Sequence, residues 1–390
     1  MPSSTSSSEA AAGVPLAKRR AAREPAAEPE IAAAPDDGLI AADALEEAHR
    51  IIPERPWGRI ALSVLVMTVA LVAIWEGYWR YRMYEPGDMK NSSSAWAQER
   101  RRAVGDATVL IGSSRNFFDI DLGVWEQTAG VRPIQLSLEG TSPRFALTDL
   151  ANDPNFRGVV IADMATPQFF ATAGGRRADV LAFTRDQTPS QRFGHRLTNA
   201  FDQVFAFLDD QTRPREIWFN QYLPTRPGQP PRRDPFKLQI MEADRNAELW
   251  RRVADDESYR QQAIDIWPMT AGRRAPPLTE AQVQAVIAEV RRDVEKIRGR
   301  GGDVIFALHP VEGIFLKAES TAFHRSRYFD RLVRETGTIG IHYQDHAGLQ
   351  GYRLPETSHL HPRDAEAYTA EFARILYAER ARRQAAVTAR

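Results

Sequence analysis

Short apolar runs separated by helical patterns fill most of the C-terminal part of this 390-residue chain. Each run is closer to continuously apolar than to alternating, which is typical of strands buried on both faces. Five runs predict strands, at 107–112, 132–138, 157–163, 303–308 and 339–344. Helical patterns occupy 142–153, 279–302, 320–337 and 361–384. Strands alternating with helices predict an α/β fold, a three-layer α/β/α domain around a mostly parallel sheet.

The segment 166–278 breaks this alternation. Residues 192–208 and 246–267 have helical spacing, and 223–235 form a proline-rich loop, LPTRPGQPPRRDP. The segment is too long for a simple crossover between parallel strands. We predict a helical insertion that covers one edge of the sheet as a cap or lid, inside a domain spanning 107–380. Residues 381–390 are expected to be a C-terminal tail.

The N-terminal region has a different pattern. Residues 1–56 are rich in Ala, Ser, Pro and Glu, and they contain too little apolar surface to offset the entropy of ordering. This composition predicts a disordered cytoplasmic tail. Within it, 39–52 has helical spacing of apolar residues, which favours a weakly helical tether over a docking helix.

Residues 57–79 form an apolar stretch with the length of a transmembrane helix. Trp57, Trp75 and Tyr78 resemble interfacial aromatic belts, and Arg59 and Arg80 bracket the stretch. Because no small-x-small cleavage site follows, we expect an uncleaved signal anchor. A polar linker, 80–106, follows with a short helix within 92–104. We predict one pass through a bacterial inner membrane, with the large C-terminal domain in the periplasm.

Composition removes several classes of function. Lys plus Arg number 51, and Asp plus Glu also number 51, so the net charge is zero. The sequence has no dense basic patch with interleaved aromatic residues, so it does not predict a nucleic-acid partner. The chain has no cysteine, which excludes disulfides, thiol nucleophiles and Cys-ligated zinc. It also lacks HExxH, Walker and GxGxxG patterns, so we expect no metal and no cofactor.

Candidate catalytic residues follow the predicted strands, where ligands bind in open parallel sheets. Ser114 lies in IGSSR after the first strand, and Gly140 follows the second. Glu356 and His359 precede the last helix, three residues apart. A serine nucleophile needs an imidazole to take its proton and a carboxylate to orient that imidazole. The backbone N–H groups of Ser114 and Gly140 can hold the oxyanion of such a reaction.

These motifs, GSSR, LEGTSP and ETSHLHPRDAEAYT, resemble blocks of the SGNH (GDSL-like) hydrolase superfamily, over about 107–376. The nearer likeness is to its membrane-anchored envelope branch, which serves acylation of surface polysaccharide and cell wall. The resemblance implies an SGNH-like fold with Ser114 as nucleophile, His359 as base, Glu356 at the usual Asp position, and Gly140 in the oxyanion hole. Ser113 replaces the family's aspartate. The Asn of the family's Gly-x-Asn-Asp block has no counterpart.

The resemblance also implies the substrate and partners. We expect an esterase or O-acetyltransferase acting on O-acetyl-type groups of a surface or exported polysaccharide, with a membrane acyl donor or an export complex as partner. Which of water or a sugar hydroxyl resolves the acyl-enzyme stays open. We expect Ser113, Arg115 and His309 to contact substrate. The alternative is a catalytically inactive envelope protein that binds polysaccharide or scaffolds its export.

Other interpretations of single residues stay open as well. Ser114 can be the N-cap of the following helix, and His359 a structural histidine. His361 and the pair Asp345–His346 are rival acid–base candidates. For Asp163, after the third strand, a structural role is favoured over metal binding, and for Arg115 a structural ion pair is favoured over binding an anionic group.

Overall fold

All five predicted strands are present and form one parallel sheet. The computed structural model describes residues 55–171, 177–213, 217–218, 237–271 and 278–389. The strands lie in the order β2-β1-β3-β6-β7, and every neighbouring pair is parallel. Their carboxyl ends therefore lie at the same edge of the sheet. The strand order reverses beside β1, because β2 lies on one side of β1 and β3 on the other. The strands are β1 (Thr108–Ile111), β2 (Ile134–Gln135), β3 (Val159–Asp163), β6 (Asp303–Leu308) and β7 (Ile339–His342).

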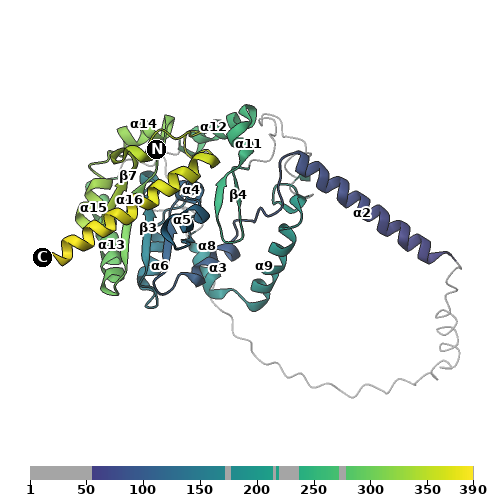
Figure 1. Ribbon diagram of the computed structural model, residues 1–390, viewed down its shortest axis with the longest axis horizontal. Helices are drawn as coiled ribbons and strands as arrows, with labels where there is room; N and C mark the ends of the chain where they lie inside the picture. Colours follow the sequence, from purple (N-terminus) through teal and green to yellow (C-terminus); the bar gives the residue numbers. More distant parts are fainter. Residues whose placement is uncertain (1–54, 172–176, 214–216, 219–236, 272–277, 390) are drawn as a thin grey trace, which may run out of the picture. The chain divides into compact units, whose positions relative to one another are not determined.

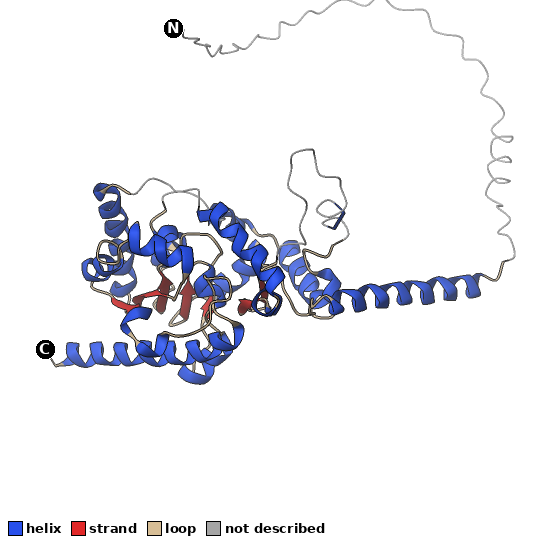
Figure 2. Cartoon of the chain, turned by 90° about the horizontal axis from the view of Figure 1, so that it is seen from above, coloured by secondary structure: helices blue, strands red, loops and turns tan. Residues whose placement is uncertain are grey.

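Two groups of helices cover the sheet, one on each face (Figures 1 and 2). In one group, Arg144 of α6 pairs with Glu289 of α13 at 2.9 Å. In the other, the ring of Trp125 on α5 packs 6.0 Å from that of Phe372 on α16. The fold is therefore α/β with a parallel sheet between helices, as predicted. The helices of this part are α4 (Ser114–Phe118), α5 (Leu122–Ala129), α6 (Arg144–Asn152), α13 (Glu280–Gly299), α14 (Gly313–Thr321), α15 (Phe329–Thr336) and α16 (Pro362–Thr388).

Burial explains the continuous apolar pattern of the strands. Every residue of β1 is buried, and only the first residue of β3 and of β6 is half-buried. The end of β1 is packed so closely that a side chain would not fit: a Cβ on Gly112 would lie 2.6 Å from the Cβ of Asn116 and 2.7 Å from that of Asp163. This close approach brings the turn after β1 against β3, and so sets the position of Ser113 and Ser114.

The insertion is only partly helical. Its described helices are α7 (Thr166–Phe169), α8 (Arg177–Asp186), α9 (Pro189–Asp202), the 3₁₀ turn η1 (Ala206–Leu208), α11 (Arg251–Asp255) and α12 (Glu257–Ala271). Between them an antiparallel hairpin, β4 (Gln239–Met241) and β5 (Ala247–Leu249), replaces the start of the helix predicted over 246–267. Each strand has only three residues, too few to show a period of two. The predicted proline-rich loop, 223–235, lies outside the described residues.

Toward the N-terminus, α2 (Trp57–Tyr81) is one helix of 25 residues, long and apolar enough to cross a membrane. The linker helix α3 (Ser93–Arg102) begins at an N-cap, Ser92, whose hydroxyl accepts from Ala95 N. The predicted tail and tether, 1–54, lie outside the described residues. At the other end, α16 continues to Thr388, so most of the expected C-terminal tail is helical instead.

A second apolar cluster joins the end of α2 to the insertion. Trp79 of α2 and Tyr84 of the linker are buried with Leu249 and Trp250 of the insertion. The rings of Tyr84 and Trp250 lie 5.1 Å apart, and Trp250 Nε1 donates to Met83 O at 3.2 Å. The linker is therefore part of the packed domain rather than a loose tether.

Candidate active site

Ser114, His359 and Glu356 form one hydrogen-bonded chain at the carboxyl edge of the sheet. His359 Nε2 lies 2.8 Å from Ser114 Oγ, and His359 Nδ1 lies 2.7 Å from Glu356 Oε1. Glu356 and His359 are buried, and the ring of Phe118 packs 4.7 Å from the imidazole. This is the arrangement in which an imidazole accepts a hydroxyl proton while a carboxylate fixes its tautomer.

Glu356 is held from two further directions. Its Oε1 also accepts from the backbone N–H of His359 at 2.7 Å, and its Oε2 accepts from Trp267 Nε1 at 2.8 Å. Trp267 belongs to α12 of the insertion, and its ring also packs 6.1 Å from that of His359. A carboxylate with three donors keeps one orientation, so the insertion helps to position the Glu356 carboxylate beside His359.

Ser114 is the first residue of α4, and Ser113 is its N-cap residue. Ser113 makes no side-chain capping bond there; its hydroxyl donates to Asp163 Oδ2 at 2.9 Å. Neither serine thus uses its hydroxyl to cap the helix. The alternative interpretation, in which the serine hydroxyl is an N-cap of α4, is therefore not what the structure shows. Ser113 is held against the third strand, while the hydroxyl of Ser114 faces the imidazole.

Three groups beside Ser114 can donate hydrogen bonds to an oxyanion. In the described part of the chain, the backbone N–H groups of Ser114 and Gly140 have no hydrogen-bond partner. Gly140 has a φ of +59°, a conformation that favours glycine. Gln168 follows β3, and the buried oxygen of its side-chain amide has no hydrogen-bond partner among the described residues; its amide nitrogen is the group that can donate. Ser114, Gly140 and Gln168 all line the same pocket.

That pocket has a volume of about 550 Å³, within the range of small-ligand sites. Ser114, Arg115, Gly140 and Gln168 line one wall. The opposite wall comes from the linker and the insertion, and it is rich in charged side chains: Asp88, Lys90, Asp202, Asp209, Asp210, Arg213 and Lys237. The pocket thus lies between the edge of the sheet and segments outside it.

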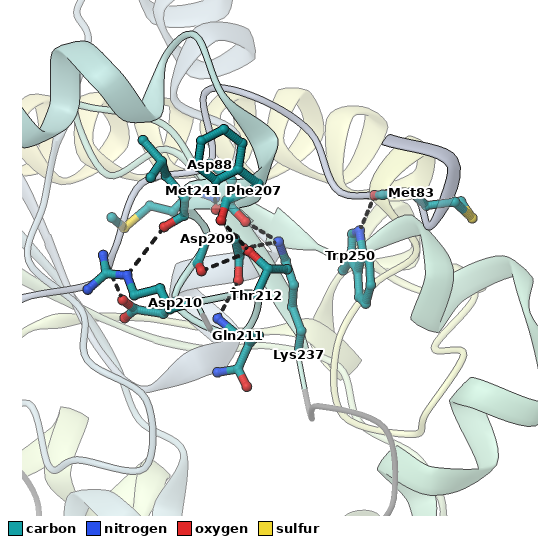
Figure 3. A network of polar contacts seen from close by, with 12 residues as sticks. Met83, Asp88, Phe207, Asp209, Asp210, Gln211, Thr212, Lys237, Met241 and Trp250 are labelled. Carbon is teal, nitrogen blue, oxygen red and sulfur yellow. Dashed lines mark hydrogen bonds and ion pairs between the residues drawn. The ribbon is translucent and has the colours of Figure 1, made fainter. Parts of the chain in front are cut away.

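Lys237 holds the opposite wall together (Figure 3). Its ammonium lies 2.6 Å from Asp209 Oδ2, pairs with Asp88, and lies 4.8 Å from the ring centre of Tyr84. Burial acts to lower the pKa of Lys237, but the two carboxylates outweigh it and raise that pKa. Burial raises the pKa of Asp88 to about 7. One buried cation thus joins the linker to the insertion.

The residues expected to contact substrate have different positions. Arg115 lines the pocket, but its guanidinium is committed to Glu319 at 2.7 Å and lies 5.5 Å from the ring centre of Phe315. His309 does not line the pocket: it is fully buried, and its two nitrogens bond to Tyr368 Oη and Asn116 Oδ1. Burial lowers the pKa of His309 to about 3, so the neutral imidazole is a structural link beneath α4.

The rival acid–base candidates make other contacts. His361 Nε2 lies 3.3 Å from Asp255 Oδ1, and both oxygens of Asp345 bond to Arg325. Asp163 is buried and accepts from Ser113, and burial raises its pKa. No group of His, Asp or Glu residues in the described part of the chain is arranged to hold a metal ion. Of the histidines proposed as base, only His359 reaches Ser114.

Two supporting residues escaped the sequence analysis. Trp267 lies 89 positions before Glu356, and nothing in the local pattern pairs them. Asp119, at the end of α4, accepts from Leu360 N at 2.8 Å and ties that helix to the segment carrying His359. Burial raises the pKa of Asp119 well above its usual range. The only sequence signal for Asp119 is an acidic residue inside the apolar run FFDI.

The site thus defined is a serine, a histidine and a glutamate in hydrogen-bond contact at the end of a parallel sheet. A scan against protein-family models finds no match for the chain, and a search of the curated proteins also finds none. Interpretation of the site therefore depends on its own geometry.

Proposed function

We propose that this protein carries out serine-dependent acyl chemistry, as an SGNH-like esterase or O-acyltransferase. The observation that supports this most strongly is the continuous chain from Ser114 Oγ through His359 to Glu356, with links of 2.8 and 2.7 Å. Such a chain activates a hydroxyl that is otherwise a weak nucleophile. Ser114 lines the pocket, so a substrate can reach its hydroxyl group.

In the first step, Ser114 Oγ forms a bond to the carbonyl carbon of an ester while His359 Nε2 takes the hydroxyl proton. The carbonyl π electrons move onto oxygen, and this oxyanion accepts from the N–H groups of Ser114 and Gly140. The C–O bond to the alcohol then breaks, and His359 returns its proton to the leaving oxygen. Glu356 stabilises the imidazolium in between.

Gln168 supplies the third oxyanion donor in this proposal. It follows β3, where the family's Gly-x-Asn-Asp block is missing, and it lines the pocket, so its side-chain amide nitrogen would be the donor. Gln168→Leu should lower kcat about 10²-fold with little change in KM, the usual cost of losing one oxyanion donor. Gln168→Asn, tested in parallel, keeps the amide and should recover part of the rate. Unchanged kcat in Gln168→Leu would remove Gln168 from the oxyanion hole.

The second half of the reaction reverses the first with a new nucleophile. Water yields an esterase, and a sugar hydroxyl yields a transferase; in both, His359 takes a proton and Ser114 leaves. Following the resemblance, the substrate is an O-acylated surface or exported polysaccharide. In this proposal α2 anchors the chain in the inner membrane, and the catalytic domain lies in the periplasm beside acyl-donor or export partners.

A fluorophosphonate probe tests the proposal, because it phosphonylates only an activated serine. Full-length protein in membranes should be labelled, and Ser114→Ala should abolish the label. Ser320→Ala, on the exposed surface of α14, is the matched control and should label like the wild type. Absence of label on folded wild-type protein would favour the inactive polysaccharide-binding alternative. Active alkaline phosphatase fused at the C-terminus would support the periplasmic orientation, and an inactive fusion would oppose it.

A further inference from the structure

Helix α9 carries a stripe of large apolar side chains on its surface. Phe193, Leu197 and Phe201, one turn apart, are 67%, 48% and 52% exposed, and Val204 just beyond the helix is 55% exposed. A surface helix of a domain that is surrounded only by water turns its large apolar side chains toward the core. Four exposed apolar side chains on one face of the helix form a patch of the kind that contacts another protein or a membrane.

The opposite side of α9 faces the domain. Its least exposed side chains are His195, Asn199 and Asp202, and Asp202 also lines the candidate active-site pocket. At 100° per residue, these three lie on the far side of the helix from Phe193 and Leu197. The apolar stripe therefore points away from the domain, and its role is not to complete the core.

Basic side chains border the stripe. Arg192 and Arg196 are exposed on α9, and Arg101 of α3 lies near both. Arg101 Nη1 donates to Gln187 Oε1 at 2.8 Å, and burial and the repulsion from these two arginines lower the pKa of Arg101. An apolar stripe bordered by arginines is the pattern of a helix that lies in a membrane interface next to anionic headgroups.

The stripe continues into the end of α2. Arg80 Nη2 donates to Val204 O at 3.2 Å, and Glu76 accepts from the N–H groups of Ala206 and Phe207 at 3.0 and 3.2 Å. The exposed rings of Trp75 and Tyr78 lie on this same end of α2. The point where α2 meets the domain is thus next to Val204, the C-terminal end of the apolar stripe of α9.

We propose that α9 is an interfacial helix, whose stripe of Phe193, Leu197, Phe201 and Val204 lies in the headgroup region of the bilayer crossed by α2. Arg101, Arg192 and Arg196 then meet lipid phosphates. This inference depends on α2 as a membrane span and not on the serine chemistry. One consequence concerns access: the helix that touches lipid also contributes its last residue, Asp202, to the lining of the pocket, so the pocket lies close to the membrane surface.

The absence of cysteine makes a site-specific test direct. Leu197→Cys in the otherwise unchanged full chain is labelled with the fluorophore NBD and placed in nanodiscs with phosphatidylglycerol. Nitroxide-labelled lipids should quench most of its fluorescence. Ser320→Cys on α14 is the exposed control and should keep its signal. Leu71→Cys reports on the span itself and should be quenched by acyl-chain nitroxides. Circular dichroism before labelling confirms that each variant is folded.

The outcomes separate the possible occupants of the stripe. Quenching at 197 well above that at 320, reduced by Arg192→Gln with Arg196→Gln, supports a lipid interface. Equal, weak quenching at both positions overturns the proposal. A blue shift at 197 that grows with protein density, without quenching by lipid, indicates a second copy of the chain and also overturns it. Loss of quenching at 71 removes the span on which the proposal depends.

Discussion

The two walls of the pocket are built in different ways. The sheet-edge wall takes Ser114 from the turn directly after β1, and the segment that leads into α16 brings His359 Nε2 to 2.8 Å from Ser114 Oγ, although β1 and β7 are not neighbours in the sheet. The opposite wall joins the linker and the insertion, which lie about 150 residues apart in the chain, through one buried ion cluster. The first wall carries the proposed chemistry, while the second depends on Lys237. Changes on the two sides should therefore produce different losses.

Glu356→Gln should produce the largest loss, on the sheet-edge wall. An amide keeps the shape of the carboxylate but does not stabilise the imidazolium or select the catalytic tautomer. We expect kcat for p-nitrophenyl acetate to fall about 10³- to 10⁴-fold, with a thermal midpoint close to that of the wild type. A loss below tenfold in the folded variant would contradict a catalytic role for this glutamate.

Lys237→Met should destabilise the opposite wall, because it leaves Asp88 and Asp209 buried without their cation. Breaking such a pair costs about 3–5 kcal/mol in the free energy of unfolding. Since the pKa of Asp88 is already raised to about 7, it can be protonated at low pH, so the cost should be larger at pH 8 than at pH 5. Urea unfolding of the full chain in detergent measures this; Lys317→Met on α14 is the control. A penalty independent of pH would contradict the role of Asp88.

His309, buried beneath α4, should make the stability of the protein sensitive to acid. Its pKa falls from 6.5 to about 3 on folding, so the unfolded chain binds a proton that the folded chain excludes. Stability from this group is present above pH 6.5 and is lost as pH falls toward 3, by roughly 2 kcal/mol at pH 5. His309→Asn should flatten the pH dependence of the free energy of unfolding. His324 is exposed, so His324→Asn should leave the pH dependence as in the wild type. If His324→Asn flattened the pH dependence as much as His309→Asn, the loss of stability in acid could not be assigned to His309.

Trp267→Phe should produce the smallest loss, and it tests how far the insertion acts on the triad. Glu356 loses one donor but keeps two bonds to His359. We expect kcat to fall about tenfold, the equivalent of roughly 1.4 kcal/mol, with KM changed less. Trp218→Phe, an exposed tryptophan of the insertion, is the matched control. No change in the pH profile or kcat of Trp267→Phe would show that its bond to Glu356 is structural only.

The sheet could be predicted from sequence because its strands are mostly buried, so they leave short apolar runs in the sequence. The hairpin β4–β5 could not, since its three-residue strands carry no readable period. Ser114 could be predicted because it follows a strand. Glu356 and His359 could be predicted because they lie only three residues apart in the sequence. Trp267, Asp119 and the partners of Lys237 are brought together only by folding, over separations that no local pattern reports.

His309 shows the opposite failure. A histidine at a strand end indicated a pocket residue, but the position after β6 is covered by Tyr368 of α16 and Asn116 of α4. Which strand end opens to solvent depends on the helices packed around it, and the periodicity of the strand contains no information about that.

The central claim, that Ser114 is an acylated nucleophile, is tested most directly by trapping the acyl-enzyme. The full-length protein is mixed with p-nitrophenyl acetate, quenched in acid within the first turnover, and digested for peptide mass spectrometry. We expect an acetyl group on Ser114 in the wild type and none at that position in Ser114→Ala. Acetylation at other residues only, or none on a folded protein that hydrolyses the ester, would contradict it.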